Sequence, residues 1–350
     1  MIKSINAWRG IFAIIIVLFH SEVHLMDQAV TLGVSFFFVA SGFLLTLRHH
    51  EKELTTPSVW WRFWWKRALR IYPVHWLALA CYMVFYLWVK NQPFKLPEFI
   101  AEIALVQCWI PNKDYFFAYN GISWFLGALL FLYACFPLIN KYYSRLRLRW
   151  QMLTLGVLMT ALACLLPYMS KECVLYSYVC PVVRLGDFLM GVTAANAYRV
   201  MSRSGLKYGT AKATIIELAA ILIAIEVIFI NRSTELLSIW GNYLIWWIPA
   251  TFIVFSAAML NGQEGLVGRM LTKRPLQFLG KISLEIYLFQ HVAAFFVNYY
   301  ISPIYGHFGY PIYDKYVWSQ IPLLLLMSWG VYMLRKRITN RHKASATNHD

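Results

Sequence analysis

Long apolar segments recur along the whole chain, and short polar stretches rich in Lys and Arg separate them. A helix needs about 20 predominantly apolar residues to cross the hydrocarbon core of a bilayer. Ten segments meet this requirement, at residues 8–26, 30–47, 71–89, 121–140, 150–168, 179–198, 213–230, 240–260, 282–301 and 317–334. The pattern predicts an all-α membrane protein, in which a bundle of ten transmembrane helices forms a single domain over residues 1–350.

One further apolar segment, Phe99–Ile110, is too short to cross a membrane. It has only about 12 residues where a span needs about 20, is flanked by Pro97 and Pro111, and contains Glu102. These features predict an interfacial or re-entrant piece rather than an eleventh span.

Composition supports an integral membrane protein. Hydrophobic residues make up 60% of the chain and charged residues only 14%, whereas the apolar share of a soluble domain is nearer one half. The first apolar segment carries Arg9 and His20 and lacks a small-residue cleavage site, so we expect it to be retained rather than removed as a signal peptide.

The net charge of +16 would suggest a nucleic-acid partner in a soluble protein. Here the basic residues lie in blocks beside the apolar spans, as the positive-inside rule describes. With the N-terminus inside, 23 of the 32 Lys and Arg residues fall on the cytoplasmic side. We therefore predict that both termini are cytoplasmic, that membrane lipid surrounds the bundle, and that no nucleic acid is bound; the oligomeric state stays open.

The six cysteines do not form a metal motif, because no C-x-x-C is present. Cys173 and Cys180 both fall in or beside the predicted outer loop between the fifth and sixth spans. In an oxidising compartment this placement permits a disulfide, but the sequence cannot supply its geometry.

The first span holds two costly groups for a membrane segment, Arg9 and His20. They are eleven residues apart, which places them roughly 16 Å apart along a helix and on nearly the same face. Ionisable groups at membrane depth usually face a bundle interior or an aqueous cavity and mark function. The alternatives are an arginine that extends to the interface and a histidine that is hydrogen-bonded between helices.

A basic stretch, "WWKRALRIYP" at residues 64–73, precedes the third span as a predicted cytoplasmic loop. Its Lys66, Arg67 and Arg70 are candidates to bind phosphate, and contact with anionic lipid is the competing interpretation. Small residues at Ser41 and Gly42 in the second span favour close helix approach.

Charged pairs occur in two later spans. Arg184 and Asp187 are three residues apart, and a mutual ion pair would lower the cost of burying both. Lys281 and Glu285 have a spacing that suits the same purpose, and His291 follows them. We assign Ser41, Arg184, Asp187, Glu285 and His291 structural or gating roles.

Taken in order, these strings resemble the acyltransferase 3 family of bacterial membrane proteins that O-acylate surface carbohydrates. The resemblance covers nearly the whole chain. The strings that carry it are Arg9 and His20 in an R-x10-H spacing, "FFFVASGF" from Phe36, "KRALRIYP" from Lys66, "SWFLGALLFLYACFPL" from Ser123, "RLGDFLMG" from Arg184 and "LGKISLEIYLFQH" from Leu279.

The chain departs from the family pattern at three places. Ser35 and Leu129 stand where many relatives carry acidic residues, and His291 lies one position later than the usual histidine, with Gln290 in that place. Relatives with an appended extracytoplasmic domain exist, but the chain ends about 16 residues after its last predicted span, so we expect no such domain.

The resemblance implies ten spans in the bacterial cytoplasmic (inner) membrane and an O-acyltransferase activity. The donor would be acyl-CoA, most often acetyl-CoA, acting as substrate without any tightly bound cofactor or metal, and the acceptor a hydroxyl of a cell-surface or lipid-linked glycan. Lys66, Arg67 and Arg70 would hold the donor phosphates. His20 and Arg9 would be catalytic, with His20 as general base or transient acyl carrier.

Two other functions remain open at this point. A transporter or flippase would use intramembrane His, Arg and Asp as a relay, although the sequence shows no paired Gly- or Pro-broken helices of an inverted repeat. A noncatalytic scaffold for glycan assembly is the third hypothesis.

Overall fold

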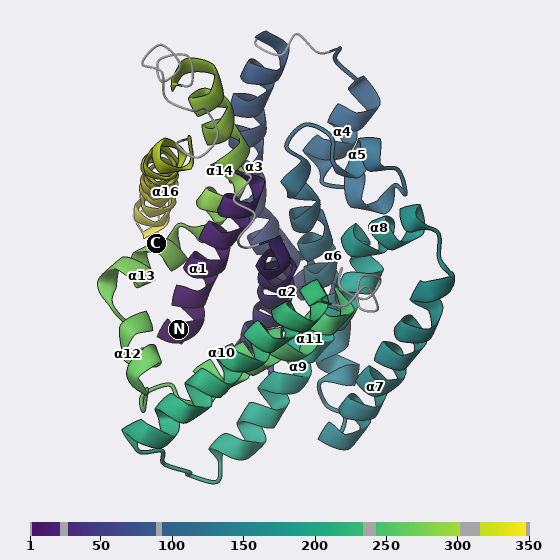
Figure 1. Cartoon of the computed structure of the whole chain (residues 1–350), viewed down its shortest axis with the longest axis vertical. Helices are drawn as coiled ribbons and strands as arrows, with labels where there is room; N and C mark the ends of the chain where they lie inside the picture. Colours follow the sequence, from purple (N-terminus) through teal and green to yellow (C-terminus); the bar gives the residue numbers. More distant parts are fainter. Residues whose placement is uncertain (1, 22–26, 89–92, 234–242, 302–315, 348–350) are drawn as a thin grey trace.

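The computed structural model describes residues 2–21, 27–88, 93–233, 243–301 and 316–347, which are helical with short connections and contain no strand (Figure 1). The longer helices are α1 (Lys3–His20), α2 (Asp27–His49), α3 (Pro57–Trp88), α6 (Trp124–Leu138), α7 (Leu148–Leu165), α9 (Pro181–Ser202), α10 (Thr210–Ser233), α11 (Trp247–Met259), α14 (Ser283–Phe296) and α16 (Tyr316–Thr347). Short helices are α4 (Leu96–Ala104), η2 (Gln107–Trp109), α5 (Lys113–Phe116), η3 (Gly121–Ser123), η4 (Ile139–Tyr143), η5 (Leu166–Tyr168), α8 (Lys171–Val179), η8 (Leu244–Trp246), α12 (Leu266–Leu271), α13 (Arg274–Lys281) and η9 (Val297–Ile301).

The all-helical class is confirmed, but the count of ten spans is not. Among the described residues six helices are long and apolar enough to cross a membrane, or seven if α8 and α9, bent by 51°, count as one span. The predicted span at 240–260 appears as a shorter apolar helix, Leu244–Met259. Parts of the predicted spans, at residues 22–26, 89 and 240–242, lie outside the described residues.

The prediction of a loop at residues 64–73 is wrong. These residues belong to α3, which begins at Pro57 and continues through Pro73. The basic side chains therefore project from a helix that runs on into the apolar bundle. Phe99–Ile110, predicted as an interfacial or re-entrant piece, folds mainly as the short helices α4 and η2.

Helices α2 and α9 cross at the centre of the bundle, where two glycines allow their backbones to touch (Figure 1). A Cβ atom at Gly42 would collide with the Phe188 carbonyl, and one at Gly191 would collide with the Val39 carbonyl. The close helix approach that Ser41 and Gly42 predicted is therefore the crossing of α2 with α9.

The N-terminal half of α1 is held by α13. Gly10 meets the backbone of Leu279 and Gly280, and the Asn6 amide donates to the Gln277 carbonyl at 3.0 Å. Farther along, α1 packs on α2 and α14, and α14 packs in turn on α3 and α16. This packing brings α1, the first predicted span, beside α13 and α14 from the last quarter of the chain.

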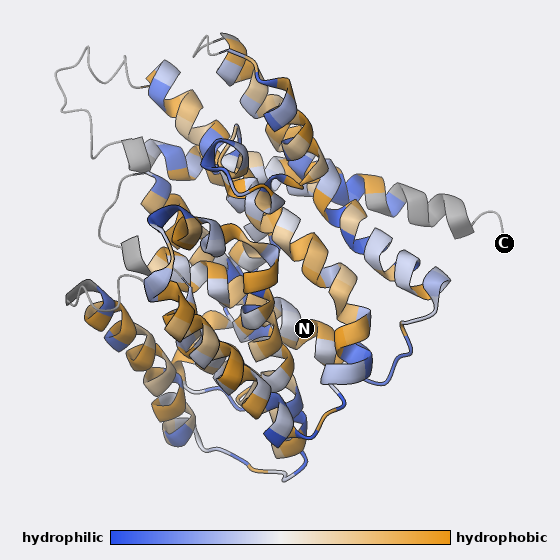
Figure 2. Ribbon diagram, turned by 90° about the vertical axis from the view of Figure 1, so that its right-hand side faces the viewer, coloured by the Kyte–Doolittle hydropathy of each residue, from blue (hydrophilic) through white to orange (hydrophobic). Residues whose placement is uncertain are grey.

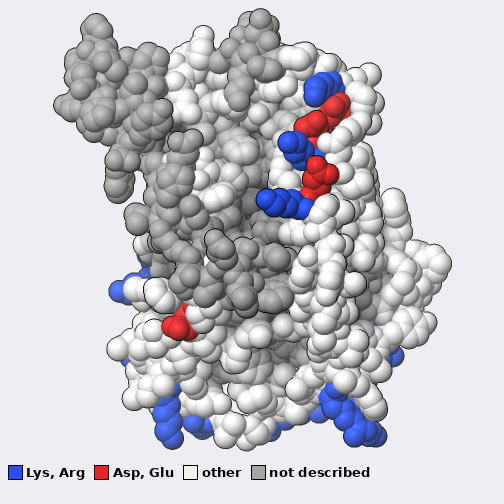
Figure 3. All heavy atoms as spheres, turned by 45° about the vertical axis from the view of Figure 1, so that its right-hand side comes forward, with Lys and Arg blue, Asp and Glu red and all other residues white. Residues whose placement is uncertain are grey.

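The surface suits a lipid environment. The peripheral helices consist largely of apolar residues (Figure 2). Some of these residues face outward: Val157 on α7 and Leu222 on α10 are each 62% exposed. In Figure 3, Lys and Arg gather at the end of the molecule where the loop joining α9 to α10 lies, and that loop contains exposed Arg203 and Lys207.

Candidate active site

Arg9 and His20 both lie on α1, as predicted, and each joins a different group of side chains. We call the groups the arginine cluster and the histidine cluster. The arginine cluster consists of Arg9, Ser41, Arg67, Tyr133, Glu285 and Arg335. The histidine cluster consists of His20, Ser21, Gln290, His291 and Gln320. Arg9 and His20 are roughly 16 Å apart along the axis of α1.

Tyr133 of α6 lies at the centre of the arginine cluster. Its side chain interacts with the guanidinium groups of Arg9 and Arg67 and lies beside the Ser41 hydroxyl. The Arg67 guanidinium lies 3.6 Å from the centroid of the Phe63 ring and 5.6 Å from that of Tyr133, and it donates to the Phe63 carbonyl at 3.0 Å. Tyr133 thus connects the first span with the basic stretch of α3.

Glu285 joins the arginine cluster through a partner that the sequence did not indicate. Its fully buried carboxylate pairs with Arg335 of α16 at 2.7 Å and also interacts with Arg9. The expected partner, Lys281, is exposed. The expected Lys281–Glu285 pair is therefore wrong, because Lys281 ends α13 and Glu285 lies in α14, so the two do not share one continuous helix.

The three basic residues predicted to bind phosphate have different surroundings. Arg67 is partly buried against aromatic rings, whereas Lys66 and Arg70 are exposed on the same helix. Arg70 also interacts with Arg67 and Tyr133. A ligand phosphate could therefore contact an exposed cation and a partly buried guanidinium on one helix.

The histidine cluster brings together two imidazoles from opposite ends of the chain. The rings of His20 and His291 lie edge to face, with centroids 5.3 Å apart. Tyr82 of α3 lies next to His291, with ring centroids 6.4 Å apart. His291, expected to be structural or gating, is thus a direct neighbour of the candidate catalytic imidazole.

Amides and a hydroxyl complete this cluster. The Ser21 hydroxyl lies 2.8 Å from Oε1 of Gln320, and the Gln320 amide donates to the Gln290 carbonyl at 3.3 Å. The Gln290 side chain is fully buried and lies beside the His20 imidazole. Three helices, α1, α14 and α16, therefore meet around His20.

The backbone fixes the tautomer of neutral His20. Its Nδ1 lies 2.8 Å from the Ile16 carbonyl oxygen, which can only accept a hydrogen bond, so Nδ1 carries the proton. The lone pair of the neutral ring is then on Nε2. The His20 residue is exposed over more than a third of its surface.

Arg184 and Asp187 form the ion pair that their spacing suggested, at 3.4 Å and with both side chains fully buried. Aromatic rings surround the guanidinium, including that of Tyr178 with its centroid at 4.5 Å. Ser35 and Trp247 lie against Asp187. The pair joins α9 to its neighbours and is separate from both clusters.

The remaining sequence predictions concern cysteines and metals. All six cysteines are free thiols. Cys173 lies on α8 and Cys180 directly after it, so they are about two turns or roughly 10 Å apart along the axis, beyond the reach of a disulfide. Within the described ranges, no group of three His, Cys, Asp or Glu side chains is placed to hold a metal ion.

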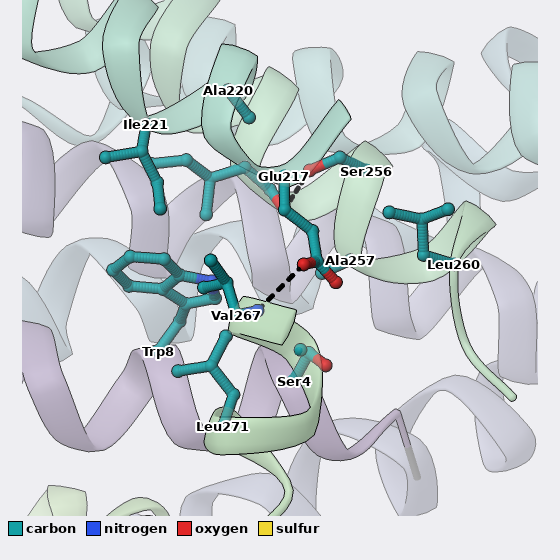
Figure 4. Close-up of a pocket in the computed structure, with 12 residues that line it drawn as sticks. Ser4, Trp8, Glu217, Ala220, Ile221, Ser256, Ala257, Leu260, Val267 and Leu271 are labelled. Atoms are coloured by element: carbon teal, nitrogen blue, oxygen red, sulfur yellow. Dashed lines mark hydrogen bonds between the residues drawn. The ribbon is translucent and has the colours of Figure 1, made fainter. Parts of the chain in front are cut away.

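Two hollows are lined by residues that belong to neither cluster. A cavity of about 20 Å³ beside Glu217 of α10 is lined by Trp8 and Val267 among others (Figure 4), and it has room for about one water molecule. Glu217 there accepts hydrogen bonds from the backbone N–H groups of Gly265 and Val267, which fixes the start of α12. An open groove of about 570 Å³ lies at the start of α3, beside Trp60, Trp61 and Trp64.

The sequence interpretation missed five residues of the two clusters: Ser21, Tyr133, Gln290, Gln320 and Arg335. Tyr133 stood in one of the quoted strings, nine residues after Trp124, but nothing in an apolar helix signalled its role. Arg335 looked like one more basic residue of the cytoplasmic tail. The places of Tyr133 and Arg335 in the site become clear only from their contacts with residues far away in the sequence.

The chain is similar in sequence to proteins described as acyltransferases. The model of the acyltransferase 3 family, described as an acyltransferase domain, matches residues 2–343. The acyltransferase MdmB of Streptomyces mycarofaciens is 25% identical over 182 residues, which cover 47% of this chain and 46% of that protein. The matched region therefore spans about half the length of that relative. No solved structure matches the chain.

Proposed function

From the premise that the chain belongs to the acyltransferase 3 family, we propose that it moves an acyl group, acetyl in the first instance, from cytoplasmic acyl-CoA to a hydroxyl of an extracytoplasmic or lipid-linked glycan. One observation carries the proposal. A single helix, α1, joins a cluster that can bind phosphate at Arg9 to the imidazole of His20, a partly exposed residue. The separation of roughly 16 Å is comparable to the length of an extended pantetheine arm.

The donor would bind at the arginine cluster. CoA carries several phosphate charges, and Arg67 can offer planar, charge-assisted hydrogen bonds while its guanidinium stays over the Phe63 ring. Exposed Lys66 and Arg70 add positive charge on the approach. Arg9 would orient the donor on the inner part of α1.

The reaction would take place at His20. Nε2 of the neutral ring accepts the proton of the glycan hydroxyl while the hydroxyl oxygen forms a bond to the thioester carbonyl carbon. The C–S bond then breaks, and the proton passes from Nε2 to the CoA thiolate, which leaves as the thiol. Alternatively, Nε2 attacks the thioester carbonyl carbon first, and the C–S bond breaks as CoA thiolate leaves. The acyl group then passes from Nε2 to the glycan hydroxyl oxygen, whose proton goes to the thiolate.

The test uses the full-length protein in liposomes with radiolabelled acetyl-CoA. We expect release of CoA and transfer of label, and a loss of roughly 10²- to 10⁴-fold in His20→Ala. His50→Ala is the control, since His50 follows the end of α2 and belongs to neither cluster. If label is neither bound nor consumed while a solute is taken up, the protein is a transporter instead.

The acceptor needs a separate experiment. Glycans from bacterial cells that express wild-type protein would be compared by mass with glycans from cells that express His20→Ala. An acetyl-sized mass difference at one sugar would identify the acceptor. Fractionation of the same cells would test the proposed location in the cytoplasmic membrane, and identical glycans in both cultures would contradict a glycan acceptor.

A further inference from the structure

We infer that Gln290 is a positioning residue for His20: its buried Oε1 and the Ile16 carbonyl form two acceptors that hold the doubly protonated imidazole during acyl transfer. The inference rests on the proposed function and assigns a role to a residue outside the candidate catalytic pair, Arg9 and His20.

The orientation of Gln290 is fixed from two sides. Its amide nitrogen donates to the Tyr287 carbonyl at 2.8 Å, which turns Oε1 away from that carbonyl. Its backbone carbonyl accepts from Gln320 of α16. The side chain is fully buried, and Oε1 has no hydrogen-bond donor among the described residues.

A buried acceptor without a donor is costly, so its presence beside a reactive ring calls for an explanation. Neutral His20 cannot supply a proton to Gln290, because its one N–H group, at Nδ1, is used by the Ile16 carbonyl. The Gln290 side chain interacts with the His20 ring, and Nε2 is the ring nitrogen that the Ile16 carbonyl leaves open. Protonation of Nε2 converts this arrangement into a charge-assisted hydrogen bond.

The neutral ring therefore makes one hydrogen bond to the protein, and the imidazolium makes two. A group that stabilises charge only as it develops lowers the barrier to the step that creates the charge. Acylation of Nε2 would create no N–H group for Oε1. The arrangement accordingly serves proton transfer from the acceptor hydroxyl rather than storage of an acyl group.

Other groups near His20 can affect its titration. His291 and Gln290 approach from α14, Gln320 approaches Ser21 from α16, and Tyr82 of α3 contacts His291. Among the described residues no Asp, Glu, Lys or Arg side chain interacts with His20. A change at Gln290 should therefore not be masked by a nearby fixed charge.

The test compares pH–rate profiles of wild type, Gln290→Leu and Gln290→Glu in liposomes, with acetyl-CoA as donor, water as acceptor and CoA release as readout. Loss of a hydrogen bond to a charged group should lower kcat by roughly ten- to hundred-fold in Gln290→Leu and move its acid limb to lower pH. A carboxylate in Gln290→Glu should move the acid limb to higher pH. Unchanged acid limbs in both variants would overturn the inference.

Gln151→Leu is the matched control, since Gln151 is also fully buried but donates to the carbonyls of Ser144 and Leu146, away from both clusters. It should lower the unfolding temperature without moving the acid limb. If wild type releases no CoA, the proposed function fails. The inference is still tested by ¹⁵N-histidine NMR, assigned with His20→Asn: a neutral ring protonated at Nδ1 supports it, and one protonated at Nε2 overturns it.

Discussion

The imidazoles of His20 and His291 lie edge to face, with ring centroids 5.3 Å apart and ring planes at 82°. The contact joins the first span to α14, across most of the length of the chain. Nδ1 of His20 is bonded to its own helix, and the ring lies between Phe19 of that helix and His291 of α14. His291 should therefore affect how His20 is oriented.

We expect His291→Ala to lower acyl transfer by up to about tenfold, because an aromatic pair contributes about 0.5–1.5 kcal/mol beyond its buried area. His20→Ala should cost far more, roughly 10²- to 10⁴-fold. His291→Phe keeps a ring at this place and should recover most of the loss. CoA release in liposomes measures all three. Equal losses in His291→Ala and His20→Ala would instead assign His291 to proton transfer.

Arg67 and Arg70 should contribute differently to donor binding. Arg67→Gln should raise the KM for acetyl-CoA roughly tenfold or more, since a hydrogen bond to a charged group contributes about 1.5–3 kcal/mol. Arg67→Lys should not recover the affinity, because an ammonium lacks the planar guanidinium that lies 3.6 Å from the Phe63 ring centroid. Arg70→Gln, at an exposed position, should have a smaller effect that fades at high salt.

Arg62 is exposed on the same helix and has no place in either cluster, so Arg62→Gln is the control. Protein abundance in the membrane should be equal in all variants. An unchanged KM in the Arg67 variants would show that this guanidinium contacts lipid or serves packing only.

The ion pair between Arg335 and Glu285 should stabilise the fold. Arg335→Gln would leave a fully buried carboxylate without its closest partner. We expect a loss on the order of 2 kcal/mol in the free energy of unfolding, less than the ~3–5 kcal/mol of a fully buried pair, because Arg335 is 31% exposed and Arg9 lies near Glu285.

Thermal unfolding in detergent would measure this loss. Adding Glu285→Gln to Arg335→Gln should restore most of the stability, since the unpaired buried charge is then removed. Lys281→Gln should change stability by less than about 0.5 kcal/mol, as for other exposed positions. A loss in Lys281→Gln as large as in Arg335→Gln would support the sequence pairing over the structural one.

Spacing along the sequence correctly predicted which residues share one face of a single helix. The pair Arg184–Asp187 follows from two charges on one face of α9, and the shared stripe of Arg9 and His20 follows from eleven residues of α1. The helical class follows from the recurrence of apolar segments. These features depend on the pitch of a helix, which the sequence specifies directly.

The sequence pattern does not predict which helices from distant parts of the chain pack together. Arg335 is available to Glu285 only because α16 packs on α14. Tyr133 lies on α6, which packs on α3, and it interacts with Arg67 of that helix and with Arg9 of α1. Residues 64–73 were predicted as a loop before the third span, yet α3 continues through them and through Pro73. A proline removes one backbone donor but does not end a helix that tertiary contacts hold.

The crossing of α2 and α9 should be intolerant of added volume. Gly42→Ala places a methyl group against the Phe188 carbonyl, and a backbone cannot move aside as a side chain end can. We expect a loss of about 1–3 kcal/mol or more in the free energy of unfolding. In Gly156→Ala on α7 the new methyl meets nothing within 4 Å, so stability should be unchanged or slightly raised. Equal unfolding temperatures for the two variants would contradict this crossing.

Glu102 of α4 should make stability depend on pH. Its carboxyl group is fully buried and accepts from the Ser123 hydroxyl at 2.6 Å and from the Gln107 amide at 3.3 Å. Burial raises the pKa of Glu102 well above its ordinary value of 4.5, and the Ser123 hydrogen bond opposes this only in part. The folded protein therefore holds this proton more tightly than the unfolded chain does.

Because the folded-state pKa is raised, the stabilising effect of the proton is complete below pH 4.5 and is lost as the pH rises from there toward the folded-state pKa. Each pH unit in this window should cost up to about 1.4 kcal/mol. Glu102→Gln cannot titrate, so its unfolding temperature should rise relative to wild type as the pH increases. The control is Glu98→Gln, one turn earlier on α4, where Glu98 pairs with Lys95 at 3.9 Å near the surface. A difference between Glu102→Gln and wild type that stays constant from pH 4 to pH 8 would show that the Glu102 carboxyl does not titrate as its burial requires.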